Sequence, residues 1–189
     1  MSPQARDDRE GRFAGFLTGL AARENRAALA ALRRGLSADR SASASMYPYV
    51  AGWITDKDTD WNEECFYLIA ALFGRHPKGD TAGGDFGWSC RELQEETGGE
   101  SFERRFVALL ASDPAGVGVH LRHAMSLVAS KNIAVDWSQL LRDLEQWGHP
   151  QRFVQRRWAR SFWRQTENGK QAENPTPDSS EESEVIPQQ

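Results

Sequence analysis

Residues 151–165 contain five arginines and no acidic residue, and the spacing of these arginines suits the binding of a polyanion. On a helix, four of them recur at every fourth position and form one row: Arg152, Arg156, Arg160 and Arg164. Arg157 lies beside the row, and Phe153 and Trp163 fall on the same side. One guanidinium group can donate two parallel hydrogen bonds to the oxygens of a phosphate, and aromatic rings stack on bases. The pattern therefore indicates a surface that follows a nucleic-acid backbone.

The alternative for this segment is an ordinary solvated helix whose aromatic residues serve the core. Val154, Trp158 and Phe162 fall opposite the arginines and suit such a core. Two features favour binding. No acidic residue within the segment lies three or four positions from any of the arginines. Every cation is arginine, although lysine would serve solubility equally well.

Other groups of polar residues give weaker indications of chemistry. His120 and His123 share a helix face, but no third metal ligand is evident in the nearby sequence, so we expect no metal site. Glu95, Glu96 and Glu100 could supply paired carboxylates for acid–base catalysis. Nothing in the nearby sequence would raise their pKa or hold a substrate, so we expect a solvated charge cluster.

The sequence contains no recognisable catalytic or nucleotide-binding motif. There is no GxxxxGK[ST], no GxGxxG after a strand and no GxSxG. The GGDFG segment at 83–87 lacks the β context of a kinase magnesium motif. Cys65 and Cys90 have no CxxC spacing or nearby histidine, and we expect buried free thiols. We predict a protein that is not an enzyme and has no cofactor.

Charge is distributed unevenly along the chain. Residues 1–165 hold 22 of the 23 basic and 21 of the 27 acidic residues, for a net charge of +1. The tail, residues 166–189, holds one basic and six acidic residues, for −5, whereas residues 120–165 carry +5. The N-terminus is too charged for a signal peptide, and no apolar run approaches the roughly 20 residues of a membrane span. We expect a soluble cytoplasmic protein with no membrane contact.

Apolar periodicity predicts a series of helices in the first half. Helical spacing of apolar residues covers 13–20, and an alanine-rich helix follows and ends at Gly35, a residue that tolerates a left-handed backbone. A capping box of Asp60 with Glu63 predicts the start of a third helix that ends at Gly74. Ser89 with Glu92 predicts a short helix that ends near 98–99.

The second half repeats the helical pattern. Apolar spacing predicts a helix over 102–110, and Asp113 then caps a helix with Pro114 at its first position. Asp136 with Gln139 predicts another capping box, and the pair 149–150, His-Pro, separates that helix from the last one.

These elements define an all-α fold class with two packed small helical bundles, about eight helices and a disordered acidic C-terminal tail. We predict an N-terminal bundle over 1–98, a C-terminal bundle with the basic last helix over 99–165, and the tail over 166–189.

Several segments resemble the CasB family, the small subunit of the type I-E CRISPR Cascade complex. The matching pieces are ALAALRRG (28–35), FYLIAALFGRHP (66–77), SFERRFVALLAS (101–112), VHLRHAMSLVASKNIAVDWSQLLRDLEQW (119–147) and VQRRWARSFW (154–163). The last two are the most specific, and together the pieces cover most of residues 1–165. The tail lies beyond the family pattern.

The resemblance implies an all-helical protein without enzymatic activity, present as two copies stacked head to tail beside other Cascade subunits. Family members help to hold the hybrid of guide RNA and target strand, and the displaced DNA strand, through basic surfaces. The residues that it implicates in binding nucleic acid are Arg33, Arg34, Arg122, Lys131, Arg156, Arg157 and Arg160.

Two other classes of protein stay open on the sequence alone. A helix-turn-helix regulator would read a major groove with its last helix, but the 149–150 pair is the nearest candidate for the required turn. A protein-binding adaptor would use Phe153 and Trp163 as interface anchors, and an unrecognised helical enzyme belongs to the same group of alternatives. Charge complementarity also raises the hypothesis that the acidic tail folds back over the basic face.

Overall fold

The structure is a computed structural model that describes residues 8–36, 44–79, 84–98 and 100–164. Within these ranges it contains nine α-helices, two short 3-10 helices and no strand, and an isolated bridge joins Gly79 to Val135. The predicted all-α class is confirmed. None of the helices in these ranges is long and apolar enough to cross a membrane. The acidic tail lies outside the described residues.

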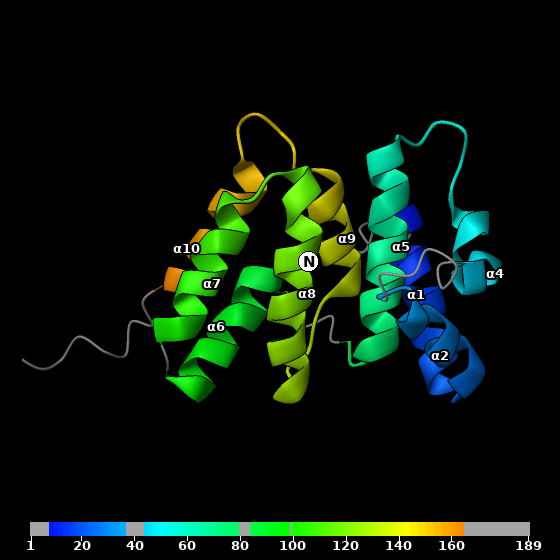
Figure 1. The fold of residues 1–189 in the computed structure, drawn as a ribbon, viewed down its shortest axis with the longest axis horizontal. Coiled ribbons are helices and arrows are strands. Elements are labelled where there is room, and N and C mark those ends of the chain that lie inside the picture. Colours follow the sequence, from blue (N-terminus) through cyan, green and yellow to red (C-terminus); the bar gives the residue numbers. More distant parts are fainter. Residues whose placement is uncertain (1–7, 37–43, 80–83, 99, 165–189) are drawn as a thin grey trace, which may run out of the picture.

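Figure 1 shows the helices side by side along the long axis, with α10 at one end and α4 at the other. The 3-10 helices cover Ala44–Met46 and Ala51–Trp53. In chain order the α-helices are α1 (Arg9–Ala22), α2 (Arg26–Arg34), α4 (Tyr47–Val50), α5 (Asp60–Arg75), α6 (Phe86–Thr97), α7 (Glu100–Ala111), α8 (Pro114–Ser130), α9 (Trp137–Glu145) and α10 (Phe153–Trp163).

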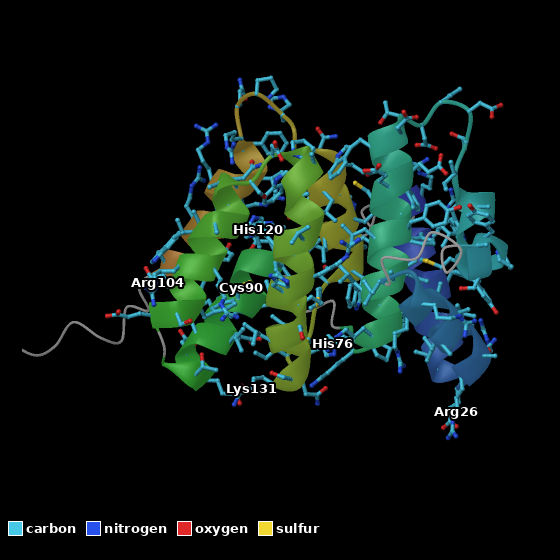
Figure 2. All side chains as sticks on the ribbon, viewed as in Figure 1. Arg26, His76, Cys90, Arg104, His120 and Lys131 are labelled. Carbon is cyan, nitrogen blue, oxygen red and sulfur yellow. The ribbon has the colours of Figure 1, made fainter. Side chains whose placement is uncertain are left out.

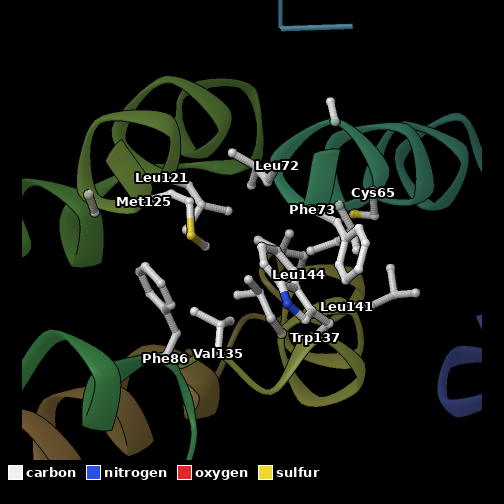
Figure 3. Close-up of a cluster of buried hydrophobic side chains, with 14 of the residues drawn as sticks. Cys65, Leu72, Phe73, Phe86, Leu121, Met125, Val135, Trp137, Leu141 and Leu144 are labelled. Atoms are coloured by element: carbon white, nitrogen blue, oxygen red, sulfur yellow. The ribbon is translucent and has the colours of Figure 1, made fainter. Parts of the chain in front are cut away.

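Helix packing crosses the division predicted at residue 98. Helix α6 packs mainly against α10, whereas α9 packs against α1 and α5. Helix α8 contacts α5, α6 and α7 and so lies between the two groups. Their buried apolar side chains form one cluster, part of which is shown in Figure 3 with Phe73 of α5, Phe86 of α6 and Trp137 of α9. The boundary at 98 stays a prediction, because each group includes a helix from the other side of it.

The core contains both cysteines. Cys65 and Cys90 are buried free thiols, as predicted. Burial raises the pKa of both groups, which keeps them protonated and unreactive.

Two helices begin at residues other than those predicted. Thr59, not Asp60, caps α5, because its side chain accepts a hydrogen bond from the backbone N–H of Asn62. Asp85, not Ser89, caps α6 by accepting from the backbone N–H of Trp88. Helix α6 therefore starts at Phe86, and Trp88 lies in its first turn.

The glycine at the end of α2 serves a different purpose from the predicted one. Gly35 has a φ of −62°, so it uses no left-handed conformation. A Cβ at this position would lie 2.0 Å from Sδ of Met46, so a larger residue would clash with the core. Gly98, with a φ of +64°, provides the left-handed end of α6.

The predicted helix starts in the second half are confirmed. Asp113 caps α8 by accepting from the backbone N–H of Gly116, and Pro114 occupies the first position. Asp136 caps α9 by accepting from the backbone N–H of Gln139. The Gln139 side chain donates to Asp143 at 2.6 Å, a bond to the next turn of α9.

A charged cluster joins α1 to α9 and to the loop before α5. Arg9 Nη1 donates to Asp58 at 2.7 Å, and Arg9 Nη2 donates to Glu145 Oε1 at 3.1 Å. The hydrogen bond from Arg9 lowers the pKa of Asp58 to about 2. Burial and the neighbouring Glu10 raise the pKa of Glu145 to about 7, although Arg9 opposes the shift.

We predict that Glu145→Gln makes stability less dependent on pH. The folded protein holds the Glu145 proton more tightly than the unfolded chain, so this group lowers the free energy of unfolding as pH rises through the interval from 4.5 to about 7. The difference in free energy of unfolding between the variant and the wild type should therefore shift by about 2 kcal/mol in favour of the variant when the pH is raised from about 5 to about 8. Urea unfolding at both pH values measures this, with the exposed Glu92→Gln as control. An equal pH dependence in all three proteins would contradict the prediction.

Candidate nucleic-acid interface

The inner face of α10 is fully packed, as its periodicity predicts. Val154 and Trp158 are completely buried, and Phe162 is nearly so. The Trp158 ring lies 4.9 Å from the ring of Trp147, and the Phe162 ring stacks on Phe106 with the ring centres 4.3 Å apart. These contacts fix the rotation of α10 about its axis, and therefore fix which side chains face outward.

A glycine allows α6 to approach α10 closely. A Cβ on Gly87 would lie 2.3 Å from the backbone oxygen of Trp158. Ser161 Oγ donates to Asp85 Oδ2 at 2.9 Å, which joins α10 to the start of α6. The two helices therefore form a rigid pair, and both contribute to the surface around α10.

A buried carboxylate of α9 also holds α10 in place. Asp143 is 1% exposed and accepts hydrogen bonds from Nε1–H of Trp158 at 2.6 Å, from Gln139 and from Arg157. Burial raises the pKa of Asp143, and these donors oppose that shift. Removing this carboxylate would leave a buried indole N–H and a guanidinium group without their acceptor.

We predict that Asp143→Ala lowers the free energy of unfolding by about 3 kcal/mol, because it leaves the buried indole N–H of Trp158 without an acceptor and removes one of the two carboxylates that engage Arg157. Arg156→Ala, in the same region but exposed, should change the free energy by less than about 0.5 kcal/mol. Chemical denaturation of both variants provides the measurement. Similar small losses for the two would show that Asp143 does not anchor α10.

The predicted arginine row is not one continuous helical row. Helix α10 begins at Phe153, and Arg152 precedes it in a left-handed conformation with a φ of +48°. The guanidinium group of Arg152 donates to the backbone oxygen of Leu110, although the side chain is exposed. Phe153 is half-buried, with its ring 4.9 Å from the ring of His149.

The remaining arginines divide into two kinds. Arg157 is paired with Asp143 and lies 3.6 Å from Asp85, so two carboxylates of the protein already engage it. Three exposed arginines have side chains that form no hydrogen bond or ion pair with other described residues: Arg156, Arg160 and Arg164. These three, which we call the open arginines, are the cations that α10 presents to solvent.

A cleft of about 720 Å³ lies beside two of the open arginines. Its lining includes Arg160 and Arg164 of the α10 end, Trp163, and Trp88 from α6. Trp163 is 44% exposed and Trp88 is 43% exposed. Sequence reasoning missed Trp88, because the predicted start of α6 at Ser89 left this residue in a loop.

The residues implicated by resemblance outside α10 lie on other helices. Arg33 lies in the last turn of α2 and donates to the backbone oxygen of Gly74 at 3.1 Å. Arg34, the last residue of α2, donates to Ser45 Oγ at 3.5 Å. Together with Arg75, which the sequence reasoning did not select, Arg33 lines a notch against the end of α8.

The two predicted cations of α8 also lie apart from the open arginines. Lys131 follows the end of α8, at the lower edge of Figure 2, and pairs with Glu96 at 3.1 Å. Arg122 is exposed and lines a groove with the acidic side chains of Asp60, Glu63 and Glu64. The structure therefore brings the α10 residues together but leaves the four other predicted residues in separate places.

The comparison with protein families agrees with the resemblance. The model of the family described as CRISPR-associated protein Cse2 matches residues 28–163, which include every helix from α5 to α10. The chain therefore belongs to the Cse2 family.

Individual relatives support this assignment over most of the chain. The CRISPR-associated protein Cse2 of Thermus thermophilus is 38% identical over 143 residues, which are 72% of this chain and 79% of that protein. The crystal structure of CasB from M. ruber matches with a TM-score of 0.69 and 31% identity, over 83% of this chain and 93% of that one. A chain of a CRISPR RNA-guided surveillance complex matches with a TM-score of 0.70 and 27% identity, over 82% and 92%.

Proposed function

We propose that this chain is a non-catalytic subunit of a CRISPR RNA-guided surveillance complex and that it contacts nucleic acid through α10. A similar chain belongs to such a complex. The observation that carries the contact is the set of open arginines on the solvent side of an anchored helix. Phosphates would satisfy these guanidinium groups, which have no carboxylate partner among the described residues.

The contact would stabilise an R-loop without reading its sequence. The guide RNA and target strand form a hybrid about as stable as the DNA duplex that it replaces, so modest backbone contacts decide the balance. Arginines that bind phosphates carry no base information. A subunit that grips the hybrid or the displaced strand therefore slows the return of the duplex for every target alike.

The partners in this proposal are the guide RNA, the target and displaced DNA strands, other Cascade subunits, and a second copy of the chain in a head-to-tail dimer. The CasB resemblance supports these partners. We propose a cytoplasmic location for the chain together with them. Four other residues would belong to further contacts, because they lie on α2, on α8 or directly after α8 and not on α10: Arg33, Arg34, Arg122 and Lys131.

We predict that reversing the charge of the open arginines flattens the salt dependence of binding. Arg156→Glu, Arg160→Glu and Arg164→Glu together should reduce the slope of log affinity against log salt by about 2 for a single strand, since each lost phosphate contact removes about 0.7. The loss should be the same for unrelated sequences. Titration of labelled oligonucleotides at several salt concentrations measures the slope.

A matched control separates a local contact from the effect of net charge. Arg12→Glu, Arg23→Glu and Arg26→Glu together change the net charge equally. The three exposed residues lie in α1, directly after α1 and in α2. Arg26 lies at the opposite end of the molecule from Arg104 of α7, a helix that packs against α10 (Figure 2). An equal change of slope in both triple variants would show that the nucleic-acid contact does not lie at α10.

A further inference from the structure

The cleft between α6 and α10 combines two exposed aromatic rings with two cations. It is lined by Trp88, Ala159, Arg160, Ser161, Trp163 and Arg164. The exposed indoles offer flat apolar faces, and the two guanidinium groups, which have no partner among the described residues, offer positive charge. The cleft therefore suits a ligand that offers both flat apolar faces and negative charge.

Neighbouring side chains hold both indoles in place. The Trp163 Nε1–H donates to Glu103 Oε1 at 3.0 Å, and its ring lies 5.7 Å from that of Phe106. The guanidinium group of Arg91 lies over the Trp88 ring, 5.4 Å from its centre. Because α6 and α10 are also held together, the two indole side chains lose little conformational entropy when a ligand binds.

The charges of the lining favour a nucleic acid over a protein surface. Among the described residues no carboxylate lines the cleft, and the side chains of Arg160 and Arg164 have no partner. Glu103 accepts from the Trp163 indole but is not part of the lining. An apolar protein surface that covered the tryptophans would desolvate these cations without pairing them, which is costly. A single strand offers bases that stack on the rings and phosphates that bind the guanidinium groups.

We propose that the cleft binds unpaired bases of a single-stranded nucleic acid, which stack on Trp88 and Trp163 while the flanking phosphates contact Arg160 and Arg164. This inference rests on the proposed function and specifies the form of nucleic acid that α10 binds. A duplex keeps its bases stacked inside the helix, so it can use the arginines but not the indoles.

The test compares a normal strand with one that lacks bases. The full-length wild-type protein is titrated with an unstructured DNA 20-mer, with the same strand carrying abasic sites along its centre, and with the duplex. We expect about tenfold weaker binding to the abasic strand, because stacking contributes substantially for each base. The normal strand should also quench tryptophan fluorescence, and the abasic strand should not.

Substitutions connect this difference to the cleft. The double variant Trp88→Leu, Trp163→Leu should bind the normal and abasic strands equally, with unchanged duplex affinity, whereas Trp88→Phe with Trp163→Phe should retain most of the preference. Thermal unfolding checks that each variant is folded, and the abasic comparison in the wild type is independent of any variant.

Each negative result has a distinct meaning. Equal wild-type affinity for normal and abasic strands, with salt-dependent binding to both, overturns the stacking inference and leaves the proposed function intact. A base preference that persists in the leucine variant also overturns it, because the bases then stack elsewhere. No binding of any oligonucleotide overturns the proposed function together with this inference.

Discussion

The buried contact between Asp143 and Trp158 is the constraint on which the rest of the candidate interface depends. A carboxylate in the interior requires donors, and the indole N–H of α10 supplies one at 2.6 Å. The ring of Trp158 also packs against Trp147, so the hydrogen bond and the ring contact together fix the position and the rotation of α10. Successive helical residues turn by about 100°, so an inward Trp158 directs Arg156 and Arg160 to solvent.

Asp85 performs a related task at the junction of α6 and α10. Its carboxylate caps α6, accepts a hydrogen bond from Ser161 and lies near Arg157. One acidic side chain thus fixes where α6 begins and how it meets α10, with Gly87 allowing the close approach. The location of Trp88 beside the open arginines follows from this junction.

Sequence periodicity predicted the helices and the inner face of α10, because both depend on local spacing. It could not separate Arg157 from Arg156, since the partner that distinguishes them, Asp143, is 14 residues earlier and is brought near only by the packing of α9. The prediction of one arginine row failed at Arg152 for a similar reason: a left-handed residue before a helix leaves no periodic signal. Trp88 was missed because Asp85 and Ser89 are both good capping residues, and only the fold selects between them.

Helix α9 transmits these constraints through the molecule. Glu145 contacts Arg9 of α1, and Asp143 contacts α10. The nine residues of α9 therefore connect the helices at one end of the long axis with the candidate interface at the other end. Asp143 is buried and Glu145 is partly buried, and both carboxyl groups have a raised pKa because of burial. Loss of the cationic partner would leave either carboxyl group uncompensated away from bulk water. Arg9 and Arg157 are therefore cations that the fold requires. The open arginines satisfy no such requirement within the described residues, so their charge is available to a phosphate at little cost to stability.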